Sequence, residues 1–95
     1  MSDWHFAQTD PQQQLAQLHF FSVLKKSGDG EVEFRITIHE YVTPREPTAR
    51  FFAHADKELN QKTAPMKPFG WGTTLLQALS ECMRLIERFP YEGDA

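Results

Sequence analysis

Residues 31–42 read EVEFRITIHEYV, and this stretch decides the fold. Apolar side chains recur at every second position, at Val32, Phe34, Ile36 and Ile38, with charged or polar residues between them. Successive side chains of a strand point to opposite sides, so this alternation is typical of a β-strand with one buried and one wetter face. We therefore expect a strand over residues 31–42.

Two further strands are predicted on either side of it. Residues 19–26 are rich in Phe and Val, and the turn sequence of residues 27–30, Ser-Gly-Asp-Gly, separates them from the central strand. Glycine accepts the positive φ that tight hairpin turns require. Residues 50–56 alternate again, after a connector at residues 43–47 whose two prolines cannot donate to a sheet. A three-stranded antiparallel meander is the simplest arrangement.

A short helix is predicted before the first strand, over residues 10–18. Asp10 can accept hydrogen bonds from free backbone N–H groups as an N-cap, and Pro11 suits the first helical position. The segment has few apolar residues, so we expect this helix to depend on tertiary packing.

A longer helix is predicted over residues 74–89. Thr74 and Gln77 fit a capping box, a wide apolar stripe follows at helical spacing, and Pro90 ends the helix. The expected class is α+β, with the order α-β-β-β-α and the last helix packed on one face of the meander. We expect one domain over residues 1–95, with residues 1–8 as a possible flexible arm and residues 57–72 as a long loop.

Composition excludes several classes of protein. The 95 residues hold ten Lys plus Arg against 13 Asp plus Glu, a net charge of −3, which argues against a generally basic nucleic-acid binder. The N-terminus has no basic and apolar signal-peptide pattern, the single cysteine cannot form an internal disulfide, and no apolar run approaches the roughly 20 residues that cross a bilayer. We expect a cytoplasmic protein.

Pairing the predicted strands gives the sheet an unusual second face. A hairpin around Gly28 and Asp29 sets Val23 opposite Phe34 and Phe21 opposite Ile36. Pairing the second and third strands around the connector sets Ile38 opposite Ala55, His39 opposite His54, and Tyr41 opposite Phe52. The face turned away from the long helix then carries Leu24 and the residues of a predicted interaction surface: Phe20, Arg35, His39, Tyr41, Arg50, Phe52 and His54.

This face is too aromatic for a plain solvated surface, and three occupants are open. The N-terminal helix or arm folds back over it, a protein covers it as a second copy or a different partner, or single-stranded nucleic acid stacks on it. The carboxylates of Glu33 and Asp56 and the acidic total disfavour nucleic acid. Further interaction candidates in the long loop are Lys67, Phe69 and Trp71.

No catalytic constellation, cofactor site or metal site is predicted. His39 and His54 supply only two possible ligands, and Cys82 lies inside the apolar helix stripe, where a buried thiol is expected. Gly70 and Gly72 ahead of a helix, with Lys67 and Thr73, could cradle an anion, but they lack the pattern of a phosphate-binding loop. We interpret these glycines first as the transition from loop to helix.

The start of the last helix resembles two families. Over residues 10–90 the order of elements resembles the double-stranded RNA-binding domain, whose G-x-G-x-S-K-K-x-A motif is matched by Gly70, Gly72, Thr74 and Ala78. Leu75 and Leu76 replace its two phosphate-binding lysines, so the resemblance implies the fold without the lysine contacts to the RNA backbone. Residues 72–79, GTTLLQAL, resemble the G-x-T-L-x-E-A-L helix entry of HicB-type antitoxins, which implies a protein partner.

The sequence thus predicts a small non-enzymatic protein-interaction module, homodimeric or part of a complex. The alternative is a nucleic-acid-binding protein that uses Arg35, Arg50, Tyr41 and Phe52. The number of aromatic residues, eight Phe, two Trp and two Tyr, exceeds what one core needs and indicates a second buried surface.

Overall fold

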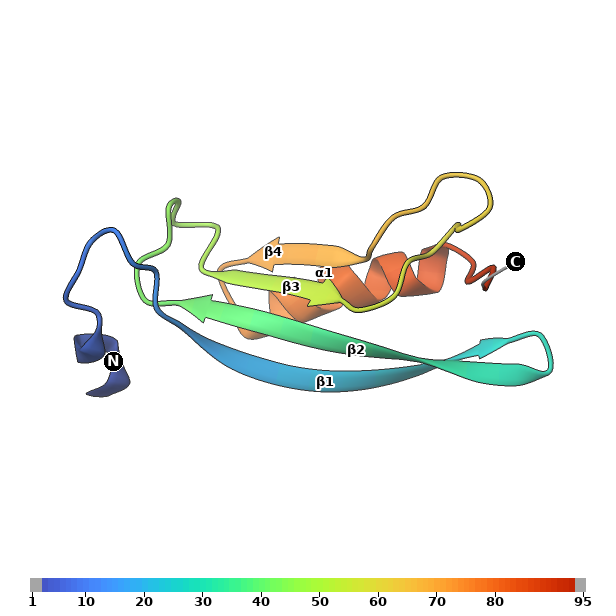
Figure 1. Ribbon diagram of the computed structural model, residues 1–95, viewed down its shortest axis with the longest axis horizontal. Helices are drawn as coiled ribbons and strands as arrows, with labels where there is room; N and C mark the ends of the chain where they lie inside the picture. The colour runs from blue at the N-terminus through green and yellow to red at the C-terminus, as the bar shows by residue number, and fades with distance from the viewer. Residues whose placement is uncertain (1–2, 94–95) are drawn as a thin grey trace.

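The computed structural model describes residues 3–93 and shows a four-stranded antiparallel sheet with a helix on one side (Figure 1). The strands lie in chain order across the sheet, and a short 3-10 helix, Asp3–Ala7, precedes them. The other elements are β1 (Ala16–Ser27), β2 (Gly30–Tyr41), β3 (Phe51–Ala55), β4 (Phe69–Gly72) and α1 (Leu75–Arg88). The α+β class and the antiparallel sheet are confirmed, but the predicted three-stranded meander is one strand short.

The β1–β2 hairpin has the predicted register. Val23 lies opposite Phe34 and Phe21 opposite Ile36, and Gly28 in the turn has a φ of 61°. This register was predictable because the two-residue turn fixes the pairing of both strands.

The predicted register between β2 and β3 is wrong by two residues. His39 lies opposite Phe52, Thr37 opposite His54, and Ile38 opposite Ala53. Alternation cannot distinguish registers that differ by two, because both keep the same residues on the same face; the irregular loop over residues 42–50 decides between them. The assignment of residues to faces is therefore unaffected.

The predicted helix over residues 10–18 is absent. Asp10 does accept a hydrogen bond from the backbone N–H of Gln12 (2.9 Å), and the N–H of Gln13 donates to its carbonyl, but these bonds close a turn. The chain then extends, and the Leu15 carbonyl accepts from the N–H of Val42 (3.1 Å). Pairing with the chain beyond β2 supplies backbone hydrogen bonds to this segment. A helix here would have few apolar side chains to bury and would therefore be no more stable.

The predicted long loop over residues 57–72 contains β4 at its end. Within the loop, Leu59 is fully buried and exchanges backbone hydrogen bonds with Met66. The N–H of Ala55 bonds to the carbonyl of Pro68, and from there Phe69–Gly72 pairs with β3. The sequence pattern did not indicate this strand, because two of its four residues are glycines, which are uncommon in strands.

The helix α1 packs against β4 and β3 and less against β2. Its N-cap is Thr74, whose hydroxyl accepts from the N–H of Gln77 (3.1 Å), as the capping pattern predicted. Among residues 3–93, no helix has the length and apolar character to cross a membrane. We call the helix-packed side of the sheet the covered face; its core consists of Phe34, Ile36, Ile38, Phe51, Ala53, Ala55, Leu59, Ala78, Cys82 and Ile86.

Small residues let α1 approach the sheet closely. A Cβ atom on Gly70 would lie 2.7 Å from the Cβ of Glu81 and 2.8 Å from the backbone N of Cys82, and one on Gly72 would lie 2.9 Å from the backbone N of Ala78. Both glycines are therefore packing positions on the covered face, as well as residues that lead into the helix.

Lys25 ties β1 to the far end of the helix. Its Nζ donates to the carbonyl oxygens of Ile86 and Phe89, both at 2.5 Å. These carbonyls have no partner within the helix, and a cation there also meets the negative end of the helix dipole. The pKa of Lys25 is lowered by burial, an effect that nearby Glu87 opposes.

The opposite side of the sheet, which we call the open face, has no helix of the described part of the chain on it (Figure 1). Residues 3–15 lie beyond the end of the sheet rather than over it, so of the three occupants left open by the sequence, the N-terminal segment does not cover this face within the described residues. Residues 1 and 2 of the predicted arm lie outside them. The molecule is elongated, 49 × 21 × 19 Å, because the β1–β2 hairpin extends past the helix at one end and residues 3–15 lie beyond the sheet at the other.

Candidate interaction surface

The open face carries aromatic rings across three adjacent strands. One row of cross-strand neighbours runs Leu18, His39, Phe52 and Trp71, and the next runs Phe20, Thr37, His54 and Phe69. Side chains two residues apart in a strand share a face, so both rows point the same way. Five of these side chains, together with Tyr41 on the same face of β2, make up what we call the aromatic platform: His39, Tyr41, Phe52, His54, Phe69 and Trp71.

The rings of the platform contact one another. The centroids of Phe52 and Trp71 are 4.3 Å apart, and those of Phe52 and His54 are 5.5 Å apart in a stacked arrangement. His39 also stacks on Tyr41, at 5.8 Å. Even so, Phe69 and Trp71 remain 48% and 46% exposed. The contacts order the rings while leaving a broad apolar area in water.

His39 and His54 form a hydrogen bond within the platform. Their Nε2 atoms are 3.1 Å apart, across a diagonal of the β2–β3 pair rather than directly opposite as predicted. One ring must donate and the other accept, so the bond requires at least one neutral imidazole. The pKa of His54 is lowered, first by burial and then by the neighbouring His39 and Lys67. The neutral form of His54 is thus favoured in the folded chain.

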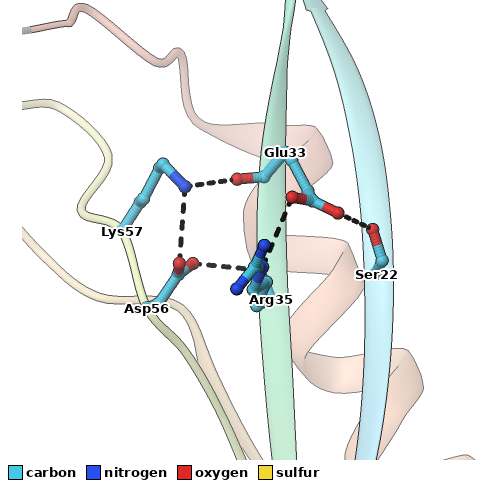
Figure 2. Close-up of polar contacts among 5 residues, drawn as sticks. All are labelled: Ser22, Glu33, Arg35, Asp56 and Lys57. Atoms are coloured by element: carbon cyan, nitrogen blue, oxygen red, sulfur yellow. Dashed lines mark hydrogen bonds and ion pairs between the residues drawn. The ribbon is translucent and has the colours of Figure 1, made fainter.

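A polar cluster occupies the part of the open face nearer the hairpin turn (Figure 2). The Ser22 hydroxyl donates to Glu33 (2.6 Å), and the Nε of Arg35 lies 3.4 Å from the same carboxylate. The backbone N–H of Arg35 donates to Asp56 (2.9 Å), while Lys57 donates to the Glu33 carbonyl (2.7 Å) and to Asp56 (3.3 Å). Both carboxylates of this cluster are therefore paired.

The cluster keeps its carboxylates ionised. The pKa of Glu33 lies below its ordinary value, chiefly because the Ser22 hydroxyl donates to it and then because of Arg35. Burial alone would raise the pKa of Asp56, but the Arg35 N–H and the Lys57 ammonium together hold it below its ordinary value. The open face is thus divided into a charged end and an aromatic end.

A pocket of about 510 Å³ adjoins the aromatic platform. Tyr41 and Trp71 supply two of its walls, and Arg45 and Glu46 of the β2–β3 loop supply charged groups of both signs. The pocket extends the apolar surface of the platform toward the loop and adds a polar rim to it.

The predicted interaction residues separate into two groups. Phe20, His39, Tyr41, Phe52 and His54 share the open face, and the loop candidates Phe69 and Trp71 join them because β4 is a strand. Arg35 belongs to the polar cluster, while Arg50 stands at the start of β3, where its carbonyl accepts from the N–H of Tyr41 (3.0 Å). Lys67 comes just before β4, near enough to His54 to lower its pKa.

The sequence interpretation missed Leu18, which lies opposite His39. Counting back by two from Phe20 would have found it, had residues 10–18 not been assigned to a helix.

Other candidate chemistry is placed elsewhere in the fold. Cys82 is fully buried in the core, and burial raises the pKa of its thiol to about 12. Gly70 and Gly72 face α1 at contact distance. In the described part of the chain, no three His, Cys, Asp or Glu side chains gather closely enough to hold a metal ion.

No protein-family model matches the sequence, and no curated protein or solved structure is significantly similar to it.

Proposed function

We propose that the chain is a non-enzymatic protein-interaction module whose aromatic platform docks against another protein. One observation carries the proposal: contiguous aromatic side chains from three neighbouring strands, of which Phe69 and Trp71 are about half exposed, with no segment of residues 3–93 lying over them. Monomeric proteins rarely leave such patches in water, and aromatic residues are enriched in the centres of protein interfaces.

The arrangement of the open face supports docking in three further ways. The rings are ordered by mutual stacking, so little side-chain entropy remains to be lost on binding. The polar cluster and the charged rim of the pocket border the apolar area, as a polar rim borders an interface core. The resemblance of residues 72–79 to HicB-type antitoxins points the same way, toward a protein partner.

Site-specific photocrosslinking in living cells tests this proposal. A benzoylphenylalanine residue in place of Phe69 or Trp71 should crosslink to one defined protein, either a second copy or a different chain. The same residue in place of Leu76, an exposed position on α1, serves as the matched control and should give no such product. Equal labelling from Leu76, or no protein adduct from either platform position, would overturn the proposal.

A second candidate function, binding of single-stranded nucleic acid, is favoured by one observation. Glu33 and Asp56 are both paired within the polar cluster at the other end of the open face, while Arg45, Arg50 and Lys67 lie around the platform. Aromatic rings with nearby cations can stack unpaired bases.

The net charge of −3 disfavours binding of an extended phosphate backbone, and this candidate function is therefore second. It requires binding of single-stranded oligonucleotides that weakens steeply as salt is raised, measured by fluorescence anisotropy. Absence of binding at low salt would remove it.

A further inference from the structure

The strand β1 is an open edge of the sheet and is much longer than the other edge. It has 12 residues, whereas β4 at the opposite edge has four, and within residues 3–93 β2 is its only neighbour in the sheet. Figure 1 shows β1 uncovered along its outer side. A long exposed edge is a template for pairing with another strand, and proteins generally protect such edges.

The unpaired backbone groups of β1 can be identified. The N–H of Val42 donates to the carbonyl of Leu15, directly opposite in the same register, so odd-numbered residues of β1 bond to β2. Hydrogen bonding alternates along an antiparallel strand, so the even-numbered residues direct their N–H and C=O groups outward. A free row of donors and acceptors therefore runs from Ala16 to Lys26.

The side chains of β1 do little to protect this edge. Phe20 is 71% exposed, Leu24 64% and Leu18 45%, all on the open face. The strand contains no proline, glycine or carboxylate that would oppose pairing. Of its two lysines, Lys25 is engaged at the end of α1, which leaves Lys26.

We propose that β1 pairs antiparallel with β1 of a second copy of this chain, about a two-fold axis at Phe21. Two four-stranded sheets then join into one of eight strands, with both helices on the same side. The inference uses the edge of the sheet rather than the aromatic platform, so it does not depend on the proposed function.

Charge and register select this arrangement. A parallel pair would set Lys25 and Lys26 beside their own copies, and like charges directly opposite are destabilising. The antiparallel pair places the lysines at opposite ends of the ladder, against Ala16 and Gln17 of the partner copy. Outward groups occur on the even-numbered residues from Ala16 to Lys26. Centring on Phe21 pairs this whole row with its copy, and it sets Leu18 against Leu24 of the partner copy.

The size of the contact predicts a moderate affinity. Eleven paired residues at about 3.4 Å each give a ladder about 37 Å long, and a sheet edge about 10 Å deep then buries about 400 Å² on each copy. The total of roughly 800 Å² lies below the standard range of about 1,200–2,000 Å². We therefore expect a dimer that dissociates on dilution, in the micromolar range.

Charge-swap variants of the full chain test this pairing by analytical ultracentrifugation over a concentration series. The L18K/L24K variant sets like charges opposite each other twice in the dimer and should weaken association about tenfold or more. The matched L18K/L24E variant sets Lys against Glu at the same two points and should dimerise at least as well as the parent. Both positions are exposed in the monomer, and circular dichroism checks that each variant folds.

Amide hydrogen exchange provides an independent readout by NMR. Amides of Leu18, Phe20, Ser22 and Leu24 should exchange fast in dilute protein and slow down as concentration rises, while odd-numbered amides of β1 are protected throughout. A chain that stays monomeric at every concentration, or a dimer unaffected by either charge variant, overturns the inference. Protection of these amides only in cell extract assigns the edge to a foreign strand and overturns it too.

The W71A variant separates this inference from the proposed function. It removes a platform ring and leaves β1 unchanged, so edge dimerisation should persist at the parent's affinity. Loss of dimerisation in W71A would place the contact on the platform and overturn the edge pairing.

Discussion

The two faces of the sheet are built from alternate residues of the same strands, yet they differ sharply in side-chain size. On β3 and β4 the covered face has Phe51, Ala53, Ala55, Gly70 and Gly72, all of them buried, and Phe51 is the one ring among these five residues. The intervening residues on the open face are Phe52, His54, Phe69 and Trp71. Apart from Phe51, the large side chains of these two strands therefore lie on the face without a helix, and the small ones lie on the face where α1 packs.

This difference explains why the chain has more aromatic residues than its core uses. The close approach of α1 to β4 requires small residues beneath it, so the rings of β4 cannot serve the core. Their position on the open face fits a surface that is selected for contact with another molecule. If the covered face determines stability and the open face does not, substitutions on the two faces should differ in how much they lower the unfolding free energy.

The largest effect is expected from adding one methyl group to the covered face, in Gly70→Ala. The new Cβ would collide with backbone atoms of α1, which cannot move aside as a flexible side chain can. Overpacking of this kind costs about 3 kcal/mol of unfolding free energy, measured by chemical denaturation.

Gly30→Ala is the matched control for that substitution. Gly30 lies in the same sheet, with no atom within 4 Å of its would-be Cβ and no positive φ. Alanine there should leave stability unchanged or raise it by about 0.4–1 kcal/mol. Equal effects of the two substitutions would contradict the close packing of α1 on β4.

The glycines also mark the limit of what the sequence could predict. The β1–β2 hairpin, β3 and α1 follow from alternation, a Gly-Asp turn and a capping pattern, which are all local signals. The fourth strand was missed because its two small residues read as loop, although they exist to fit a helix that follows in sequence. The strand Phe69–Gly72 therefore depends on a tertiary contact, which local sequence patterns do not contain.

A smaller loss is expected from Lys25→Met, which tests how β1 is attached to the covered face. Methionine keeps the length and apolar stem of the side chain but leaves the carbonyls of Ile86 and Phe89 without their donor. We expect the unfolding free energy to fall by about 1–2 kcal/mol.

Lys26→Met is the control, because Lys26 points to the open face and is exposed. Its effect should stay within about 0.5 kcal/mol. A Lys25 variant as stable as the Lys26 variant would mean that the helix end does not need this contact.

The open face should tolerate the loss of its largest ring. Trp71→Ala removes a half-exposed side chain that packs on Phe52 with ring centroids 4.3 Å apart. An aromatic pair contributes about 0.5–1.5 kcal/mol, so we expect a loss of about 1 kcal/mol by chemical denaturation. A loss as large as that of Gly70→Ala would show that the platform belongs to the core, which would weaken its assignment to an interface.

The membership of the open face was predicted better than its geometry. Phe20, His39, Tyr41, Phe52 and His54 were placed on one face because a shift of two residues in the β2–β3 register preserves faces. The same shift moved His54 from opposite His39 to a diagonal, which alternation could not reveal. The pairing of Arg35 with Glu33 was also beyond the sequence, because it depends on side-chain conformation within the polar cluster.

The smallest effect is expected from pH, through the His39–His54 pair. Burial, His39 and Lys67 lower the pKa of His54 in the folded state, so the unfolded chain takes up the proton first as pH falls. The contribution of His54 is therefore complete above its ordinary pKa of about 6.5 and is progressively lost as pH falls from there through the lowered folded value.

The His54→Gln variant isolates this contribution, because the two proteins differ at this position alone. Glutamine can still donate to His39 but takes up no proton in this range. We expect the unfolding free energy of the parent to fall more than that of the variant between about pH 8 and pH 5, measured by denaturant titration at each pH. Parallel curves would show that folding does not lower the pKa of His54. The platform would then be open enough to water to hold a charged imidazole.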